Sequence, residues 1–178
     1  MSVHIALLRA INVGGRVVKM APLREMCEGI GLTGVETFIA SGNVIFSSAA
    51  KAPALEKKLE ALFASRLGFE VATFVRSVPD LTAIVARAGA LAKKAGATSV
   101  YVGFLKAEPD GVSRTEVRAF ANDIESFEFS GREVYWLSTQ GVSDSKFSYA
   151  VLERILGSPA TFRNITTVRK LEAKYAGP

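Results

Sequence analysis

The order of the predicted secondary-structure elements occurs twice in this chain of 178 residues. The sequence predicts strand, helix, hairpin, helix and strand within residues 3–75, and the same order within residues 100–162. In each repeat a Leu-Gly pair precedes an Ala-Thr-Phe segment, and an arginine, Arg76 or Arg163, follows closely. Repetition of both the pattern and the residues indicates an internal duplication.

A half with the order βαββαβ forms a four-stranded antiparallel sheet with both helices on one face, a ferredoxin-like arrangement. We therefore predict an α+β fold with two such halves, a linking helix and a C-terminal helix. The halves should occupy residues 1–77 and 98–178, with the linking helix at 78–97, in one compact unit. Residues 3–11 are apolar on both faces, as in a central strand. We expect the halves to bury sheet surface against each other or against a partner.

Proline and glycine positions locate the elements of the first half. Pro22 is expected at the first position of a helix that ends near Gly31, because its fixed φ suits a helix start. A second helix should run from Pro53 to Gly68. Ser41-Gly42-Asn43 has the composition of a hairpin turn. The strands after the first are expected at residues 35–39, 44–46 and 71–75.

The second half shows comparable patterns. Ser113 and Glu116 form a capping-box pattern ahead of a helix predicted to include Val117, Phe120 and Ile124. A second hairpin is expected around residues 130–132, and a helix with Phe147, Val151 and Ile155 should end at Gly157. The strands are expected at residues 100–105, 127–129, 134–137 and 160–162.

Composition excludes several classes of protein. The longest apolar stretch, residues 3–13, contains His4, Arg9 and Asn12, so it suits neither a membrane span nor a signal peptide, and we expect a cytoplasmic protein without membrane contact. One cysteine, Cys27, and one histidine predict no disulfide, metal site or cofactor. Residues 1–97 carry 12 basic and 7 acidic side chains, whereas residues 98–178 carry 10 of each. The whole net charge of +5 therefore lies in the first part of the chain, where it favours an anionic partner.

Several short motifs resemble those of a bacterial family known as domain of unknown function 1697. They are Leu7-Leu8-Arg9-Ala10-Ile11-Asn12-Val13-Gly14-Gly15, Ser41-Gly42-Asn43, Ser145-Lys146, and Arg163-Asn164 followed by Thr167-Val168-Arg169-Lys170-Leu171. The resemblance extends over essentially the whole chain and implies a duplicated ferredoxin-like fold, but no reaction, substrate or cofactor. This sequence departs from the family at Ala10, where a glycine is expected, at Ala40, where a polar residue is expected, and at Ile165, where tryptophan is usual.

The loop at residues 12–16, Asn-Val-Gly-Gly-Arg, is the best candidate for a binding site. It follows a central strand and precedes Lys19, so backbone N–H groups and cations could hold an anion. Its glycines also fit a simple tight turn, and it matches neither common nucleotide-binding glycine pattern. Arg9 is expected to contact either a ligand or a structural acid. The predicted ligand-binding residues are Arg9, Asn12, Gly14, Gly15, Lys19, Lys146, Arg163 and Asn164.

The remaining polar motifs have structural explanations as well. Ser145 and Lys146 are expected to begin a helix, and Asn164 is a good cap for the C-terminal helix. We expect the Ser41-Gly42-Asn43 turn and the end of the first strand at opposite ends of the sheet, so that one half cannot combine them in a site. His4 lies in an apolar strand and is interpreted as structural. No catalytic motif is present, so the sequence assigns no reaction.

The sequence is compatible with three functions. The first is binding of, or action on, a small phosphate- or carboxylate-bearing ligand. The second is RNA or DNA binding, which a pI of about 9.5 favours, although the aromatic signature of RNA-recognition modules is missing. The third is an interaction module whose apolar sheet faces mediate dimerisation. The protein is accordingly expected to be a monomer or a homodimer.

Overall fold

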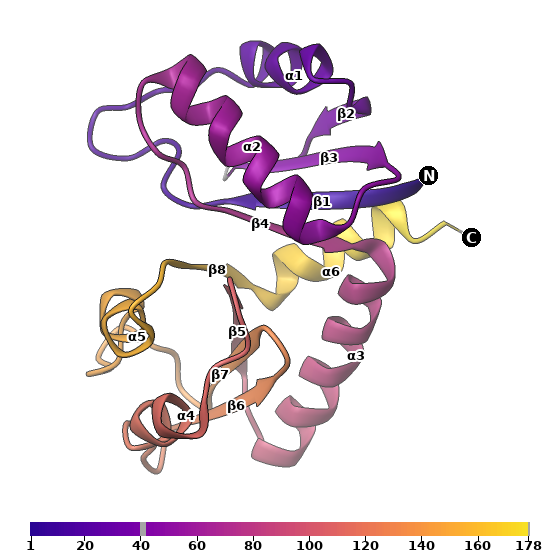
Figure 1. The fold of residues 1–178 in the computed structure, drawn as a ribbon. Helices are drawn as coiled ribbons and strands as arrows, with labels where there is room; N and C mark the ends of the chain where they lie inside the picture. The colour runs from indigo at the N-terminus through magenta and orange to yellow at the C-terminus, as the bar shows by residue number, and fades with distance from the viewer. Residues whose placement is uncertain (40–41, 178) are drawn as a thin grey trace. The chain divides into compact units, whose positions relative to one another are not determined.

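The computed structural model of the protein describes residues 1–39 and 42–177. The chain divides into two compact units, the first formed by Met1–Leu81 with Ala173–Pro178 and the second by Thr82–Glu172. Each unit holds one four-stranded antiparallel sheet (Figure 1). The predicted α+β fold with two βαββαβ halves is therefore confirmed. In the described residues, no helix is both long enough and apolar enough to cross a membrane.

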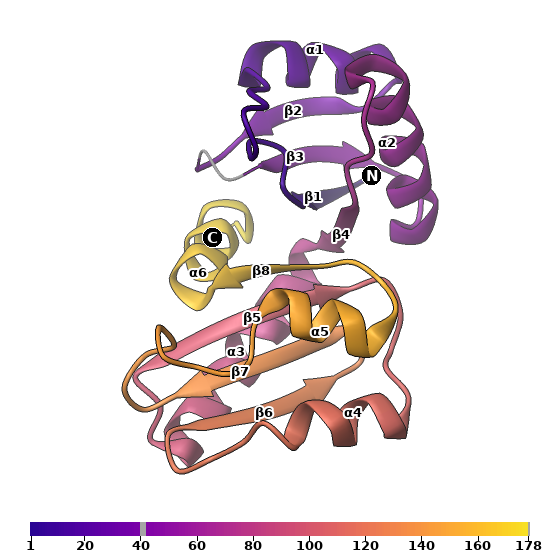
Figure 2. The ribbon, with the colours of Figure 1, turned by 90° about the vertical axis from the view of Figure 1, so that its left-hand side faces the viewer.

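The first unit is a sheet of strand order β2-β3-β1-β4 with α1 and α2 on one face (Figures 1 and 2). The central β1 pairs with β3 on one side and β4 on the other, as its two apolar faces predict. Side chains from α1, α2 and the sheet form one core, which includes Leu8, Leu23 and Phe63. The elements are β1 (Ser2–Leu8), α1 (Met20–Gly29), β2 (Thr33–Thr37), β3 (Asn43–Ser48), α2 (Ala52–Leu67) and β4 (Thr73–Ser77).

The second unit repeats this arrangement with strand order β6-β7-β5-β8. Helices α4 and α5 lie on one face of its sheet and most of α3 on the other (Figures 1 and 2). Aromatic side chains dominate the core under α4 and α5, among them Phe127, Trp136 and Phe147. The elements are α3 (Val78–Ala95), β5 (Ser99–Leu105), α4 (Gly111–Arg118), β6 (Glu125–Ser130), β7 (Glu133–Ser138), α5 (Tyr149–Leu156), β8 (Ala160–Asn164) and α6 (Ile165–Tyr175).

Matching hydrogen bonds show which residues of the two units are equivalent. Glu60 of α2 accepts a hydrogen bond from the Thr73 backbone N–H at 2.9 Å, and Glu153 of α5 accepts one from the Ala160 N–H at the same distance. Thr73 therefore corresponds to Ala160, one residue away from the alignment that the repeated Ala-Thr-Phe letters give. The cross-strand registers of β4 and β8 agree, because they make Arg76 and Arg163 equivalent.

The first strand is shorter than predicted. β1 ends at Leu8 instead of Ile11, and the chain bends at Ala10, whose φ is +53°. A left-handed residue cannot continue a strand, so Ile11 leaves the sheet and packs into the core beside Leu8. Ala10 is the position where the family resemblance predicts glycine, and its backbone gives the physical reason for that glycine.

Ala10→Gly is expected to raise the free energy of unfolding by roughly 0.5–1 kcal/mol. The left-handed conformation costs an alanine about 1–2 kcal/mol, and the greater freedom of glycine in the unfolded chain returns part of that gain. Urea denaturation of both proteins measures the difference. An unchanged or lower midpoint would contradict the strained conformation of Ala10.

Three helix starts also differ from the predictions. α1 begins at Met20, so Pro22 is its third residue, where a missing N–H costs no intrahelical bond. α4 is capped by Asp110, whose side chain accepts a hydrogen bond from the Ser113 N–H at 2.7 Å, so the capping box is wrong. The same helix ends at Arg118, before the two apolar residues expected in it, Phe120 and Ile124. α5 begins at Tyr149 with Ser148 as its cap, not at Ser145.

Candidate functional site

The loop between β1 and α1 contains five of the predicted ligand-binding residues. The Arg9 backbone N–H donates to the Ala72 carbonyl at 2.9 Å. The Asn12 side-chain oxygen accepts a hydrogen bond from the Val18 N–H at 2.7 Å, which closes the loop on itself. Asn12 thus stabilises the loop, and its side-chain NH₂ group remains available to donate to an outside partner.

Two consecutive glycines form the tip of this loop. Gly14 and Gly15 have φ values of +63° and +81°, and no neighbouring atom lies within 4 Å of where a Cβ would be placed. The backbone conformation, not crowding, therefore requires glycine here. Lys19 occupies the N-cap of α1 without a side-chain capping hydrogen bond, and it is exposed, as is Arg9.

The hairpin turn between β2 and β3 lies at the same end of the sheet as this loop, which contradicts the expectation of opposite ends. The Leu8 N–H donates to the Gly42 carbonyl at 2.8 Å, and a Cβ on Gly42 would lie 2.9 Å from the Ile11 side chain. The start of β3 pairs with the end of antiparallel β1, so the turn must lie beside the loop. Ser41 of the predicted turn and Ala40 lie outside the described residues.

Arg163 and Asn164, at the end of β8, have structural roles in the second unit. Arg163 is 8% exposed, and its guanidinium donates to the Thr161 hydroxyl at 2.8 Å and to the Phe162 carbonyl at 2.9 Å. Burial lowers the pKa of Arg163 to about 10, against a smaller opposing effect of Tyr149. Asn164 accepts a hydrogen bond from the Thr166 N–H at 2.9 Å, so it caps α6 as predicted.

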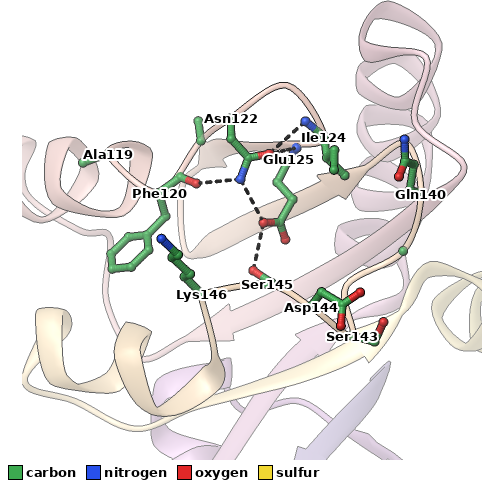
Figure 3. A pocket seen from close by; sticks show the side chains of 12 residues that line it. Ala119, Phe120, Asn122, Ile124, Glu125, Gln140, Ser143, Asp144, Ser145 and Lys146 are labelled. Carbon is green, nitrogen blue, oxygen red and sulfur yellow. Dashed lines mark hydrogen bonds between the residues drawn. The ribbon is translucent and has the colours of Figure 1, made fainter.

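Lys146 lines a cavity of about 590 Å³ in the second unit. The loop between α4 and β6 and the loop between β7 and α5 form its walls (Figure 3). Because α5 starts only at Tyr149, Lys146 belongs to the preceding loop. The lining residues are Ala119, Phe120, Ala121, Asn122, Ile124, Glu125, Gln140, Gly141, Ser143, Asp144, Ser145 and Lys146.

Glu125, which sequence reasoning missed, is the centre of the hydrogen-bond network in this cavity. Its carboxylate accepts hydrogen bonds from Trp136 Nε1 at 2.8 Å, Ser145 Oγ at 2.9 Å and Asn122 Nδ2 at 3.3 Å. Asn122 also receives the backbone N–H groups of Ile124 and Glu125 on its side-chain oxygen (Figure 3). An acidic residue at the start of a predicted aromatic strand, eleven residues before the single tryptophan, is too weak a pattern to identify this network.

The predicted residues therefore fall into separate places. Arg9, Asn12, Gly14, Gly15 and Lys19 lie together in one loop of the first unit. In the second unit, Lys146 lines the cavity, whereas the end of β8 does not. Within the described chain, no group of His, Cys, Asp and Glu side chains is placed to hold a metal ion. Cys27 is buried, and burial raises the pKa of its thiol to about 12, which does not suit a nucleophile.

His4 is buried in β1 and stacks on Phe46 with ring centroids 5.9 Å apart. Its Nδ1 atom has no hydrogen-bond partner among the described residues. Burial lowers the pKa of His4, against smaller opposing effects of the Ser48 backbone and Asp80. The neutral ring is thus the form that the fold accommodates, which agrees with the structural role predicted for it.

A pH titration should show this lowered pKa directly. His4 is the single histidine, so one imidazole NMR signal reports it without assignment, and its midpoint is expected below about 6.5. The unfolded chain binds more protons in this range, so the free energy of unfolding should fall as pH drops from about 7 through the folded pKa. His4→Gln should flatten this slope. A titration midpoint at or above that of a free histidine would contradict the lowered pKa of His4.

Comparisons with known proteins agree with this architecture. The sequence profile of the family described as "Protein of unknown function (DUF1697)" matches residues 1–135. The chain is similar to the solved structure of the conserved bacterial protein SP0830 from Streptococcus pneumoniae, with 25% sequence identity, a TM-score of 0.69 and 97% of each chain covered. A comparison with curated proteins gives no match. The family resemblance is therefore confirmed over residues 1–135, whereas the motifs at residues 145–146 and 163–171 lie beyond the matched part. The chain belongs to the DUF1697 family.

Proposed function

We propose that the protein binds a small phosphate- or carboxylate-bearing ligand at the loop between β1 and α1. One observation carries this proposal: residues 9–24 contain four basic side chains and no acidic one. All four, which are Arg9, Arg16, Lys19 and Arg24, are exposed. Several cations on one segment attract anions, and the attraction is strongest when the ligand also meets backbone N–H groups.

The conformation of the loop supports binding of an anion by its backbone. Gly14 and Gly15 are both left-handed and open to solvent, so a ligand can approach their N–H groups without meeting a side chain. The Arg16 guanidinium lies over the Phe69 ring at 4.4 Å, which keeps a cation close to the loop. Val13 and Val17 are exposed on either side, and Val17 is 81% accessible, so the loop also offers apolar contact.

A small ligand fits these observations better than a nucleic acid. Proteins that bind single strands usually present several aromatic rings for base stacking. Among the described aromatic residues, Tyr149 alone has a highly exposed side chain, and it belongs to α5 in the second unit. The dimerisation module has less support still, because sheet residues such as Ile5, Phe74 and Phe104 are buried, and the exposed large apolar residues do not form a sheet face.

A thermal-shift panel with pyrophosphate, ADP, glucose 6-phosphate and citrate tests the proposal. A ligand at a hundredfold excess over its dissociation constant stabilises a protein by about 2.7 kcal/mol, roughly 5–11 °C for a chain of this length. Arg9→Ala and Lys19→Ala should each lose this shift while the unliganded proteins stay folded. Lys57→Ala, which removes an exposed cation from α2, is the matched control and should keep it.

The salt dependence distinguishes the alternatives. A shift that persists at moderate salt identifies a defined anion site, whereas retention on a short RNA that falls steeply with salt would favour the nucleic acid. Equal shifts in Arg9→Ala, Lys19→Ala and Lys57→Ala would refute the loop as the binding site.

A further inference from the structure

The cavity of the second unit is held in shape by its own hydrogen bonds. Ser145 donates to Glu125 and accepts the Phe147 N–H at 3.0 Å, which ties the β7–α5 loop to the start of β6. The Ser138 hydroxyl donates to the Gly141 carbonyl at 2.6 Å and receives the Gly141 N–H at 3.0 Å, which fixes the other end of that loop. A cavity of about 590 Å³ lies within the range of small-molecule sites.

Two opposite charges line this cavity without neutralising each other. Lys146 and Asp144 are two residues apart, yet neither forms an ion pair or side-chain hydrogen bond within the described part of the chain. Figure 3 shows them on opposite sides of the contact between Glu125 and Ser145. The side-chain amide of Gln140 also lines the cavity without a described hydrogen bond. The cavity thus presents a cation, an anion and an amide to whatever enters it.

The buried carboxylate between these charges adds a second acceptor. Glu125 is 5% exposed, and its three hydrogen bonds leave acceptor capacity on Oε1, which accepts only the Trp136 N–H within the described part of the chain. Phe120 and Ile124 supply an apolar part of the same wall. The lining therefore combines two carboxylates, one ammonium group and an apolar patch.

From this lining we propose that the cavity binds a small zwitterion of amino-acid type with an apolar side group. The ligand carboxylate would pair with Lys146, its ammonium group with Asp144 and Glu125, and its side group would lie against Phe120 and Ile124. A simple anion would meet two carboxylates, and a simple cation would meet Lys146, so only a molecule with both charges satisfies the site. The proposal does not depend on the loop site of the first unit.

A set of three related probes separates these charges. L-Phenylalanine carries both charges, phenethylamine lacks the carboxylate, and 3-phenylpropionate lacks the amine. In ¹H–¹⁵N NMR titrations at millimolar concentration, phenylalanine should shift amide signals of residues 119–125 and 140–146. Each single-charge analogue should bind about tenfold more weakly, the effect of losing one charge-assisted hydrogen bond.

Variants assign each charge to its residue. Lys146→Met keeps the aliphatic stem and should weaken phenylalanine binding about tenfold while leaving phenethylamine binding unchanged. Asp144→Asn should weaken phenylalanine but not 3-phenylpropionate. Lys170→Met, on α6, is the matched control and should behave as the unmodified protein, as should Arg9→Ala. Absence of any phenylalanine-induced shift in these segments, equal binding of 3-phenylpropionate, or unchanged phenylalanine binding in both cavity variants would overturn the proposal.

Discussion

Gly103→Ala is expected to lower the free energy of unfolding by about 2–3 kcal/mol, the upper part of the range for overpacked cores. A Cβ at this position in β5 would lie 2.6 Å from Val134 Cγ1 and 2.7 Å from Phe162 Cζ. Real Cβ atoms do not approach other carbons this closely, so a neighbour must move. Gly103 has an ordinary negative φ, so the effect comes from packing alone.

Neither neighbour of Gly103 can move freely. Val134 is fully buried in β7, and its β-branched side chain is restricted at χ1. The Phe162 ring is stacked against Tyr149, with centroids 4.3 Å apart and planes at 4°, and it meets the Trp136 ring edge to face at 6.2 Å. A shift of Phe162 would therefore disturb two further aromatic contacts, which is why a cost near the top of the range is expected.

Gly89→Ala provides the matched control for this measurement. Gly89 lies within α3, its added Cβ would meet no atom within 4 Å, and its φ is not positive. Alanine there should raise the free energy of unfolding by roughly 0.5–1 kcal/mol, because it is the better helix former. Thermal unfolding measures both variants, with an expected decrease of roughly 4–12 °C in Tm for Gly103→Ala. Equal Tm values for the two variants would contradict the close packing of β5.

The fold could be predicted because the sequence signals for its strands and helices are local and occur in both halves. β1 and β3 contain short apolar runs, and each helix has a proline or a polar cap near its start, so element order follows from neighbours in sequence. The start of a helix was less predictable where two nearby residues could each serve as its N-cap. Ser145 and Ser148 are both good helix caps, and Ser148 caps α5 while the Ser145 hydroxyl donates to Glu125, twenty residues away. That long-range contact is not visible in the sequence.

The candidate sites were predicted only in part for the same reason. The charge of the loop at residues 9–19 is a property of consecutive residues, so the sequence identified it. The cavity of the second unit joins two loops that are separated by β6 and β7, and of its charged residues the sequence predicts only Lys146 as a ligand contact. Its central residue, Glu125, differs from a surface glutamate only through the tertiary positions of Trp136, Ser145 and Asn122.

Glu56→Ala is expected to lower the free energy of unfolding by about 3–5 kcal/mol, the cost of removing one member of a buried ion pair. Glu56 of α2 lies 3.6 Å from the Arg76 guanidinium, with side-chain exposures of 7% and 2%. The same carboxylate oxygen accepts the Val75 N–H at 2.8 Å, so the substitution also removes the partner of a buried backbone group in β4. Loss of both contacts places this among the largest effects of any single substitution in the first unit.

The second unit has a different neighbour for the equivalent arginine. One helical turn before Glu60 lies Glu56, and one turn before the equivalent Glu153 lies Tyr149. Arg163, the counterpart of Arg76, is buried beside that tyrosine, and its pKa is lowered to about 10. The duplicated position thus keeps the arginine and replaces the acid, so the effect of the carboxylate is specific to the first unit.

Urea denaturation of a double variant tests the role of the ion pair. Glu56→Leu with Arg76→Met should recover most of the stability lost in Glu56→Ala, because a buried ion pair can be replaced by apolar side chains at small cost. Glu60→Ala, one turn further along α2, removes an acceptor of the Thr73 N–H and should cost about 1 kcal/mol. If Glu56→Ala costs no more than Glu60→Ala, the ion pair with Glu56 does not stabilise the buried Arg76 guanidinium, whose other contacts include the Val75 carbonyl.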